Sequence, residues 1–223
     1  MKKAIIGKKL GMTQIFTPSG RVVPVTVIEA GPCVVIAKKT VEKDGYDSLV
    51  VSFGDVKESR LNKPKLGAFK KIDAEPKKTI KELKLEGDYE IGATINCDIF
   101  SENDKIDISG VSKGHGFSGV IKRHGFRRNR MSHGAGPIHR SLGSTSASTT
   151  YARVFKNKKM PGQYGHDNVT IQNLEVAKVD RDRNILLVKG CVPGPKNSLV
   201  IVKEAVKQAQ KENSKSANKE GGN

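Results

Sequence analysis

The chain has 223 residues, with 40 Lys and Arg against 23 Asp and Glu, which gives a formal net charge of +17 at pH 7. A chain this cationic is expected to bind a polyanion, with nucleic acid ahead of an anionic membrane surface or a heparin-like polymer. It has no apolar run of the roughly 18 residues that a spanning helix needs, no signal-peptide pattern and three widely spaced cysteines, which disfavour a disulfide framework. Membrane and disulfide-rich secreted classes are therefore disfavoured, and we expect a cytoplasmic protein.

Short β-rich runs bounded by Gly, Pro and Asp dominate both ends of the sequence. The expected strands lie at residues 4–6, 12–16, 22–29, 33–41, 48–53, 94–100, 105–109, 169–179, 185–188 and 199–202. Short strands that follow one another at intervals of about ten residues are typical of a closed or nearly closed antiparallel barrel. The expected fold class is therefore mainly β.

Two further segments differ from the strand-rich parts. Residues 57–92 are dense in lysine and are interrupted by Pro64 and Pro76, so we expect a small basic α+β lobe with a short helix. A helix is also expected from Lys203 to about Asn213. The polar residues after it predict a disordered end, so that residues 206–223 form a basic tail.

The excess charge is concentrated in residues 110–168. This segment holds 11 Lys and Arg against a single acid, Asp167, together with all five histidines and ten of the 23 glycines. Solvated faces normally mix both signs because like charges repel, so the segment is either a disordered basic loop or a partner of a polyanion. Its interleaved aromatic residues argue against disorder. Because the later strands are needed to complete the barrel, residues 110–168 are expected to be an insertion in a barrel formed by residues 1–109 and 169–205.

Three other interpretations of this segment are weaker. Gly114, Gly116 and Gly119 match the dinucleotide-binding fingerprint, but Gly125 interrupts the helix that should follow, and no acid lies between Asp107 and Asp167 to hold a ribose. The five histidines have no zinc-like spacing and no cysteine near them, so we expect neither a metal nor another cofactor. An enzyme would need an orienting carboxylate, and Asp167 is the only candidate in the segment, so we do not expect an enzyme. Two alternatives stay open: a small nuclease that uses two histidines, and a free RNA chaperone.

Arginine is enriched in this segment, and its flat guanidinium pairs with phosphate and stacks on bases. Folded RNA offers narrow crevices, unstacked bases and 2′-hydroxyls to such a loop, whereas no helix suited to the DNA major groove is visible. The candidate RNA-binding residues are Lys8, Lys9, Lys113, His115, Lys122, Arg123, His124, Arg127, Arg128, Arg130, His133, His139, Arg140, Arg153, Lys156, Lys158 and Lys159.

One spaced pattern resembles the hallmark of a known family, the bacterial type of ribosomal protein L3. Its positions are filled here by Phe100, Asp107, Gly110, Ser112, Gly114, His115, Gly116, Gly119 and Arg123. The runs GKKLGMTQIF, NKPKLGAFKK, RVFKNKKMPGQYG and LLVKGCVPGP are also typical of that family, and the resemblance covers about residues 1–205.

The resemblance implies a six-stranded barrel akin to those of translation factors, with residues 110–168 as a long inserted finger. It implies a structural constituent of the large ribosomal subunit that binds the 3′ region of the large (23S-type) rRNA and nucleates early assembly. The finger is then expected to extend towards the peptidyl transferase centre, with residues 127–140 nearest its inner end. The expected partners are this rRNA and ribosomal proteins fourteen and nineteen, without a membrane and without self-association.

Overall fold

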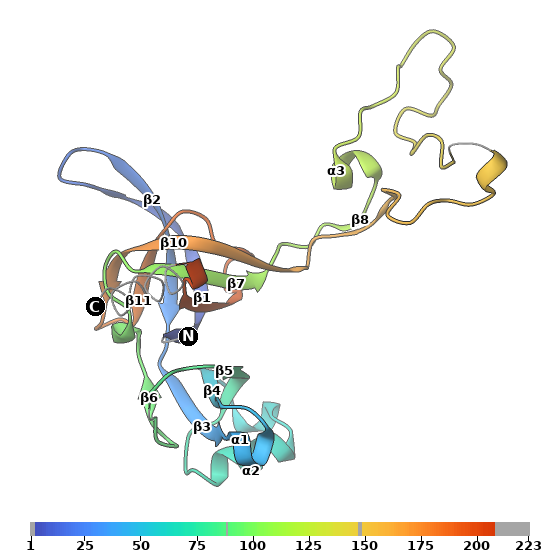
Figure 1. Ribbon diagram of the computed structural model, residues 1–223. Coiled ribbons are helices and arrows are strands. Elements are labelled where there is room, and N and C mark those ends of the chain that lie inside the picture. Colours follow the sequence, from blue (N-terminus) through green and yellow to red (C-terminus); the bar gives the residue numbers. More distant parts are fainter. Residues whose placement is uncertain (1–2, 88, 147–148, 208–223) are drawn as a thin grey trace, which may run out of the picture. The chain divides into compact units, whose positions relative to one another are not determined.

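The computed structural model describes residues 3–87, 89–146 and 149–207 (Figure 1). The chain forms two compact units. One comprises Met1–Val111 and Asn168–Asn223 and is called the barrel unit below; the other comprises Ser112–Asp167 and is called the basic unit. No helix of the described ranges is long and apolar enough to cross a membrane.

Six antiparallel strands of the barrel unit close into a barrel, which confirms the predicted mainly β fold. Around the barrel the order is β1 (Ala4–Phe16), β12 (Leu199–Glu204), β7 (Lys105–Val111), β10 (Asn168–Asp180), β11 (Ile185–Lys189) and β2 (Val22–Ala30). Inward positions hold branched apolar residues such as Ile28, Ile108 and Val202, all fully buried. Branched side chains favour strands because they pack well on a pleated surface. Bulges in β1 and β10 add the local bending that closure requires.

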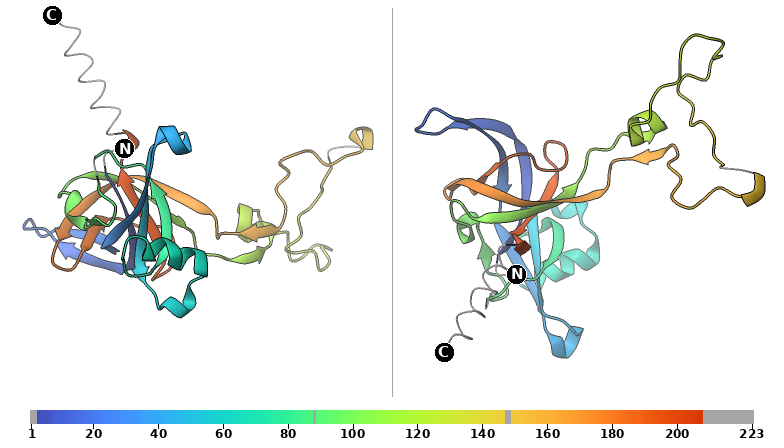
Figure 2. Two further views of the ribbon diagram at one scale, coloured as in Figure 1. Left: turned by 90° about the horizontal axis from the view of Figure 1, so that it is seen from below. Right: turned by 45° about the horizontal axis from the view of Figure 1, so that its top comes forward.

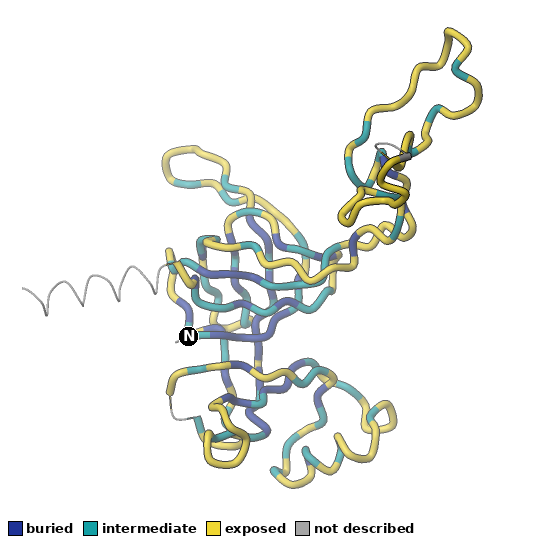
Figure 3. Tube along the Cα trace, turned by 45° about the vertical axis from the view of Figure 1, so that its right-hand side comes forward, coloured by how far each residue is buried: buried dark blue, intermediate teal, exposed yellow. Residues whose placement is uncertain are grey.

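A four-stranded sheet in the same unit has the order β5 (Lys77–Leu83), β4 (Ser48–Asp55), β3 (Cys33–Lys39) and β6 (Thr94–Ile95). Its short helices are α1 (Val41–Asp44), η1 (Glu58–Arg60), α2 (Lys63–Lys70) and η2 (Cys97–Ile99). Pro64 stands in the first turn of α2, where its missing N–H costs nothing. Leu49 and Leu83 of this sheet join Ile5 and Ile106 of the barrel in one apolar core, and Figure 3 shows the buried segments running through both.

The largest differences from the predicted strands lie in two regions. Residues 4–6 and 12–16 belong to one long strand, β1, because Gly7 continues the pairing; a Cβ on Gly7 would lie 2.8 Å from the Glu29 carbonyl oxygen. Residues 94–100 form a strand only at Thr94–Ile95, followed by the 3₁₀ turn η2. The turn allows Cys97 and Phe100 to be buried together, whereas residues three apart in a strand point to opposite faces.

The predicted C-terminal helix falls mostly outside the described residues. The last strand, β12, continues to Glu204, and helical geometry is described only at residues 206 and 207. The expected disordered end after Asn213 lies outside the described residues as well.

Candidate nucleic-acid interface

The basic unit is built on a small two-stranded ribbon (Figure 2). Strand β8 (Gly116–Ser118) pairs with β9 (Gly162–Tyr164). Beside the ribbon, the first and last residues of the basic unit are hydrogen-bonded to each other. The Ser112 N–H donates to the Asp167 carbonyl oxygen at 2.9 Å, and the Asp167 N–H donates to Ser112 Oγ at 3.1 Å.

Gly165 makes this closure possible. A Cβ on Gly165 would lie 2.1 Å from the Lys113 carbonyl oxygen, and its φ of +72° is one that other residues rarely adopt.

Two side chains fasten helix α3 (Val120–His124) to the segment just before β9. The Arg123 guanidinium donates from Nη1 to the Met160 carbonyl oxygen at 2.8 Å, and His124 Nε2 lies 3.1 Å from the same oxygen. The guanidinium also covers Gly162, where a Cβ would lie 2.8 Å from Nη1. Both predicted RNA-binding residues therefore also hold the basic unit together.

Asn129 closes the next loop of the basic unit. Its backbone N–H donates to the His139 carbonyl oxygen at 3.1 Å, and its side-chain Nδ2 donates to the Ile138 carbonyl oxygen at 2.8 Å and to Ser141 Oγ at 3.2 Å. These bonds bring residues 129 and 139 together and leave the loop between them in solvent. An open hollow of about 550 Å³ is lined by residues 127–131, three of which are arginines.

The segment after the 3₁₀ turn η3 (Thr149–Tyr151) is ordered by ring contacts instead of a core. The rings of Tyr151 and Phe155 meet edge to face with centroids 5.2 Å apart, and Arg153 Cζ lies 5.5 Å from the Phe155 centroid. Such a cation–π contact keeps the guanidinium near an aromatic face while its N–H groups stay accessible.

Most of the predicted RNA-binding residues of the basic unit are exposed, and three are half-buried. The exposed residues are Lys113, His115, Lys122, Arg127, Arg128, Arg130, His133, Arg140, Arg153, Lys156, Lys158 and Lys159. Arg123, His124 and His139 are half-buried.

Acidic partners are concentrated in the barrel unit, where ion pairs among the described residues join Lys3 to Asp104, Lys39 to Glu82, Lys77 to Asp55 and Lys105 to Glu175. The basic unit has one acid, Asp167, for eleven Lys and Arg. A surface of this kind suits a ligand that brings its own negative charge.

Lys9 does not belong to this surface. It is 8% exposed, and its Nζ donates to the carbonyl oxygens of Val192 and Gly194 at 2.7 and 2.9 Å. The ammonium group therefore ties β1 to the loop before β12, and we leave Lys9 out of the proposed interface. Sequence alone gives no signal that distinguishes it from Lys8.

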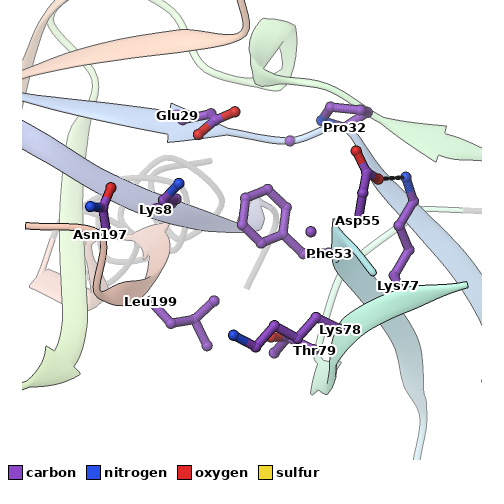
Figure 4. Close-up of a pocket in the computed structure, with 12 residues that line it drawn as sticks. Lys8, Glu29, Pro32, Phe53, Asp55, Lys77, Lys78, Thr79, Asn197 and Leu199 are labelled. Atoms are coloured by element: carbon purple, nitrogen blue, oxygen red, sulfur yellow. Dashed lines mark hydrogen bonds and ion pairs between the residues drawn. The ribbon is translucent and has the colours of Figure 1, made fainter. Parts of the chain in front are cut away.

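Lys8 is half-buried and lines a cavity of about 550 Å³ within the barrel unit (Figure 4). Lys77 and Lys78 add positive charge to this cavity, whereas Glu29 and Asp55 oppose it, and Asp55 is paired with Lys77. The candidate RNA-binding residues from the sequence did not include Lys77 and Lys78, although the density of lysine in residues 57–92 was a signal for them. The mixed charge makes this cavity a weaker polyanion site than the surface of the basic unit.

The hallmark pattern divides between the two units. Phe100 is 1% exposed in the barrel core. Asp107 is 6% exposed and accepts N–H groups of Asn173 at 2.7 Å and Val206 at 3.2 Å. The later positions of the pattern, from Ser112 to Arg123, build the base of the basic unit. One continuous pattern thus both completes the barrel and starts the insertion.

A comparison with protein families agrees with this division. The model of the family described as Ribosomal protein L3 matches residues 72–184, slightly more than half of the chain. The match spans β7, the whole basic unit and β10. The chain therefore belongs to the ribosomal protein L3 family, whose members are structural, RNA-binding proteins of the large ribosomal subunit and take part in translation.

Proposed function

We propose that the basic unit binds the large-subunit rRNA, and that the barrel unit folds on its own core and anchors it. The observation that carries this proposal is the charge of the basic unit, eleven Lys and Arg against one acid, on side chains that are mostly exposed. RNA supplies both the counter-charge and a packing surface for a segment of this composition.

The family membership extends this proposal to a place in the ribosome. Residues 110–168 act as a finger inserted between barrel residues 1–109 and 169–205, with residues 206–223 as a basic tail. The protein binds the 3′ region of the 23S-type rRNA early in assembly of the subunit, beside ribosomal proteins fourteen and nineteen. The finger reaches towards the peptidyl transferase centre, and residues 127–140 lie nearest its inner end.

The salt dependence of rRNA binding tests the proposal. If about eight cations contact phosphates, the logarithm of the affinity falls with the logarithm of salt concentration with a slope near −6, from roughly 0.7 to 0.9 per contact. Filter binding of the full chain to a large-subunit rRNA transcript over a salt series gives this slope. A slope shallower than about −2 would contradict a phosphate-bound basic unit.

A matched pair of variants locates the contacts. Arg128→Ala removes an exposed cation of the basic unit, and Lys43→Ala removes an exposed cation of α1 in the barrel unit. The first is expected to make the slope shallower by about 1, and the second to leave it unchanged. Equal effects of both variants would show that the whole surface, and not the basic unit, attracts the RNA.

A further inference from the structure

The ribbon at the base of the basic unit has two different faces. Directly paired residues of antiparallel strands point to the same side of the ribbon, and neighbours along each strand point to opposite sides. Ser118 pairs with Gly162, whereas Phe117 pairs with Gln163. The first pair therefore marks one face of the ribbon and the second pair marks the other.

At the Ser118–Gly162 pair, one of these faces is covered by protein. Ser118 is 5% exposed, and the Arg123 guanidinium from α3 lies over Gly162. The face of Phe117 and Gln163 is open: both residues are exposed, and Phe117 is 81% exposed. That value is the largest for any large apolar side chain in the part of the chain that the structure describes.

The glycines near this ring carry no side chains that could cover it. Gly116 precedes Phe117, Gly119 follows two residues later, and a Cβ added to either glycine would meet nothing within 4 Å. An exposed phenylalanine forgoes the roughly 1.5–3 kcal/mol that burial of its side chain provides. The ring therefore contributes little to the fold of the free protein, and most of its surface can be approached.

We propose that Phe117 is a stacking site for one unpaired nucleobase. This inference rests on the proposed binding of rRNA and names a contact that charge alone does not provide. Sequence-specific and structure-specific RNA recognition relies on splayed bases that stack on aromatic side chains. Lys113 before the ribbon and Lys122 in α3 are exposed cations of the same unit, available for the phosphates that flank such a base.

An apolar pocket of another protein is the competing occupant, and the surroundings of the ring disfavour it. Protein docking sites use contiguous apolar patches of several hundred Å², whereas the residue paired with Phe117 is the polar Gln163 and its nearest glycines offer no side chain. A single ring with a polar cross-strand partner, in a unit with one acid for eleven cations, matches the size and the charge of one nucleotide.

Three substitutions of Phe117 separate these possibilities when the full chain is titrated with a large-subunit rRNA transcript at fixed salt. Phe117→Ala is expected to weaken binding roughly 5- to 100-fold, the range for loss of one stacked base. Phe117→Leu keeps an apolar side chain without a π-face and is expected to bind nearly as weakly. Phe117→Trp is expected to retain affinity within about threefold, since a larger ring still stacks.

The salt slope is expected to stay unchanged in all three variants, because no charge is removed. Phe16→Ala is the matched control, since Phe16 is 68% exposed on β1 of the barrel unit; its affinity is expected to equal that of the wild type.

Each other outcome is decisive. If Phe117→Ala binds rRNA with wild-type affinity, the stacking site is overturned. The proposed function is still supported in that case if binding depends steeply on salt concentration. Wild-type affinity of Phe117→Leu with weak binding of Phe117→Trp overturns it in favour of an apolar pocket. An equal loss in Phe16→Ala shows that no particular ring is used, and failure of the wild type to bind the transcript overturns the proposed function as well.

Discussion

Every strand of the barrel unit buries at least one apolar side chain, whereas Val120 is the one apolar side chain that the described residues of the basic unit bury. The barrel unit also contains acidic partners for its lysines, and the basic unit has Asp167 alone. The basic unit keeps its shape through backbone bonds at its base, the Asn129 bonds and a few ring contacts. Burial stabilises the first unit from within, whereas we propose that the second gains packing and counter-charge from rRNA.

Amide exchange of the free chain is expected to show the largest difference between the two units. Exchange in the barrel strands requires global unfolding, whereas residues 120–160 open locally because almost none of the described residues in that range is buried. We expect protection factors to differ by more than about a thousandfold. Addition of rRNA should protect residues 120–160. Strong protection of that segment before RNA is added would contradict the comparison.

Truncation of two phenylalanines, one in each unit, is expected to change the free energy of unfolding by very different amounts. Phe100→Ala should lower the free energy of unfolding by about 3–5 kcal/mol, because the ring is 1% exposed and leaves a cavity. Phe117→Ala should change it by less than about 0.5 kcal/mol, because that ring is 81% exposed. Urea unfolding of both variants measures the difference. Similar losses would mean that the basic unit shares the stability of the barrel.

Gly165→Ala is expected to disrupt the base of the basic unit without unfolding the barrel. The new Cβ would collide with the Lys113 carbonyl oxygen, and a φ of +72° alone costs an alanine about 1–2 kcal/mol. Loss of the β8–β9 amide protection, with unchanged barrel melting and weaker rRNA binding, is the expected result. Gly67→Ala in α2 of the barrel unit, where a Cβ meets nothing within 4 Å, is the control and should retain both the β8–β9 protection and the rRNA binding.

Removal of the exposed arginines is expected to have a small effect on stability, as for Phe117. Arg128→Ala and Arg140→Ala should each change the free energy of unfolding by less than about 0.5 kcal/mol, since both side chains are exposed in the basic unit. Their rRNA affinity should nevertheless fall, with a salt slope shallower by about 1 for each. Thermal melting and filter binding together check this. A large loss of melting temperature would assign these residues to folding.

Local composition predicted most of the barrel strands, because a strand buried on one or both faces requires branched apolar residues in short runs. It did not predict that β1 is continuous through Gly7, since the pairing of Gly7 with Ala30 depends on how closely β2 approaches. It placed a strand at residues 94–100, where burial of Cys97 and Phe100 on one side favours a 3₁₀ turn. Contacts between distant residues decided both cases.

The same division holds for the candidate interface. By itself, the sequence determined that the excess charge lies in residues 110–168 and that the hallmark pattern of the family is present, because charge and spacing are properties of the chain order. Only the tertiary structure decided that the Lys9 ammonium is bound by two carbonyl oxygens and that Arg123 covers one face of a ribbon whose other face presents Phe117. The direction of a side chain depends on strand pairing and on what already occupies each face, and neither can be read from residue types.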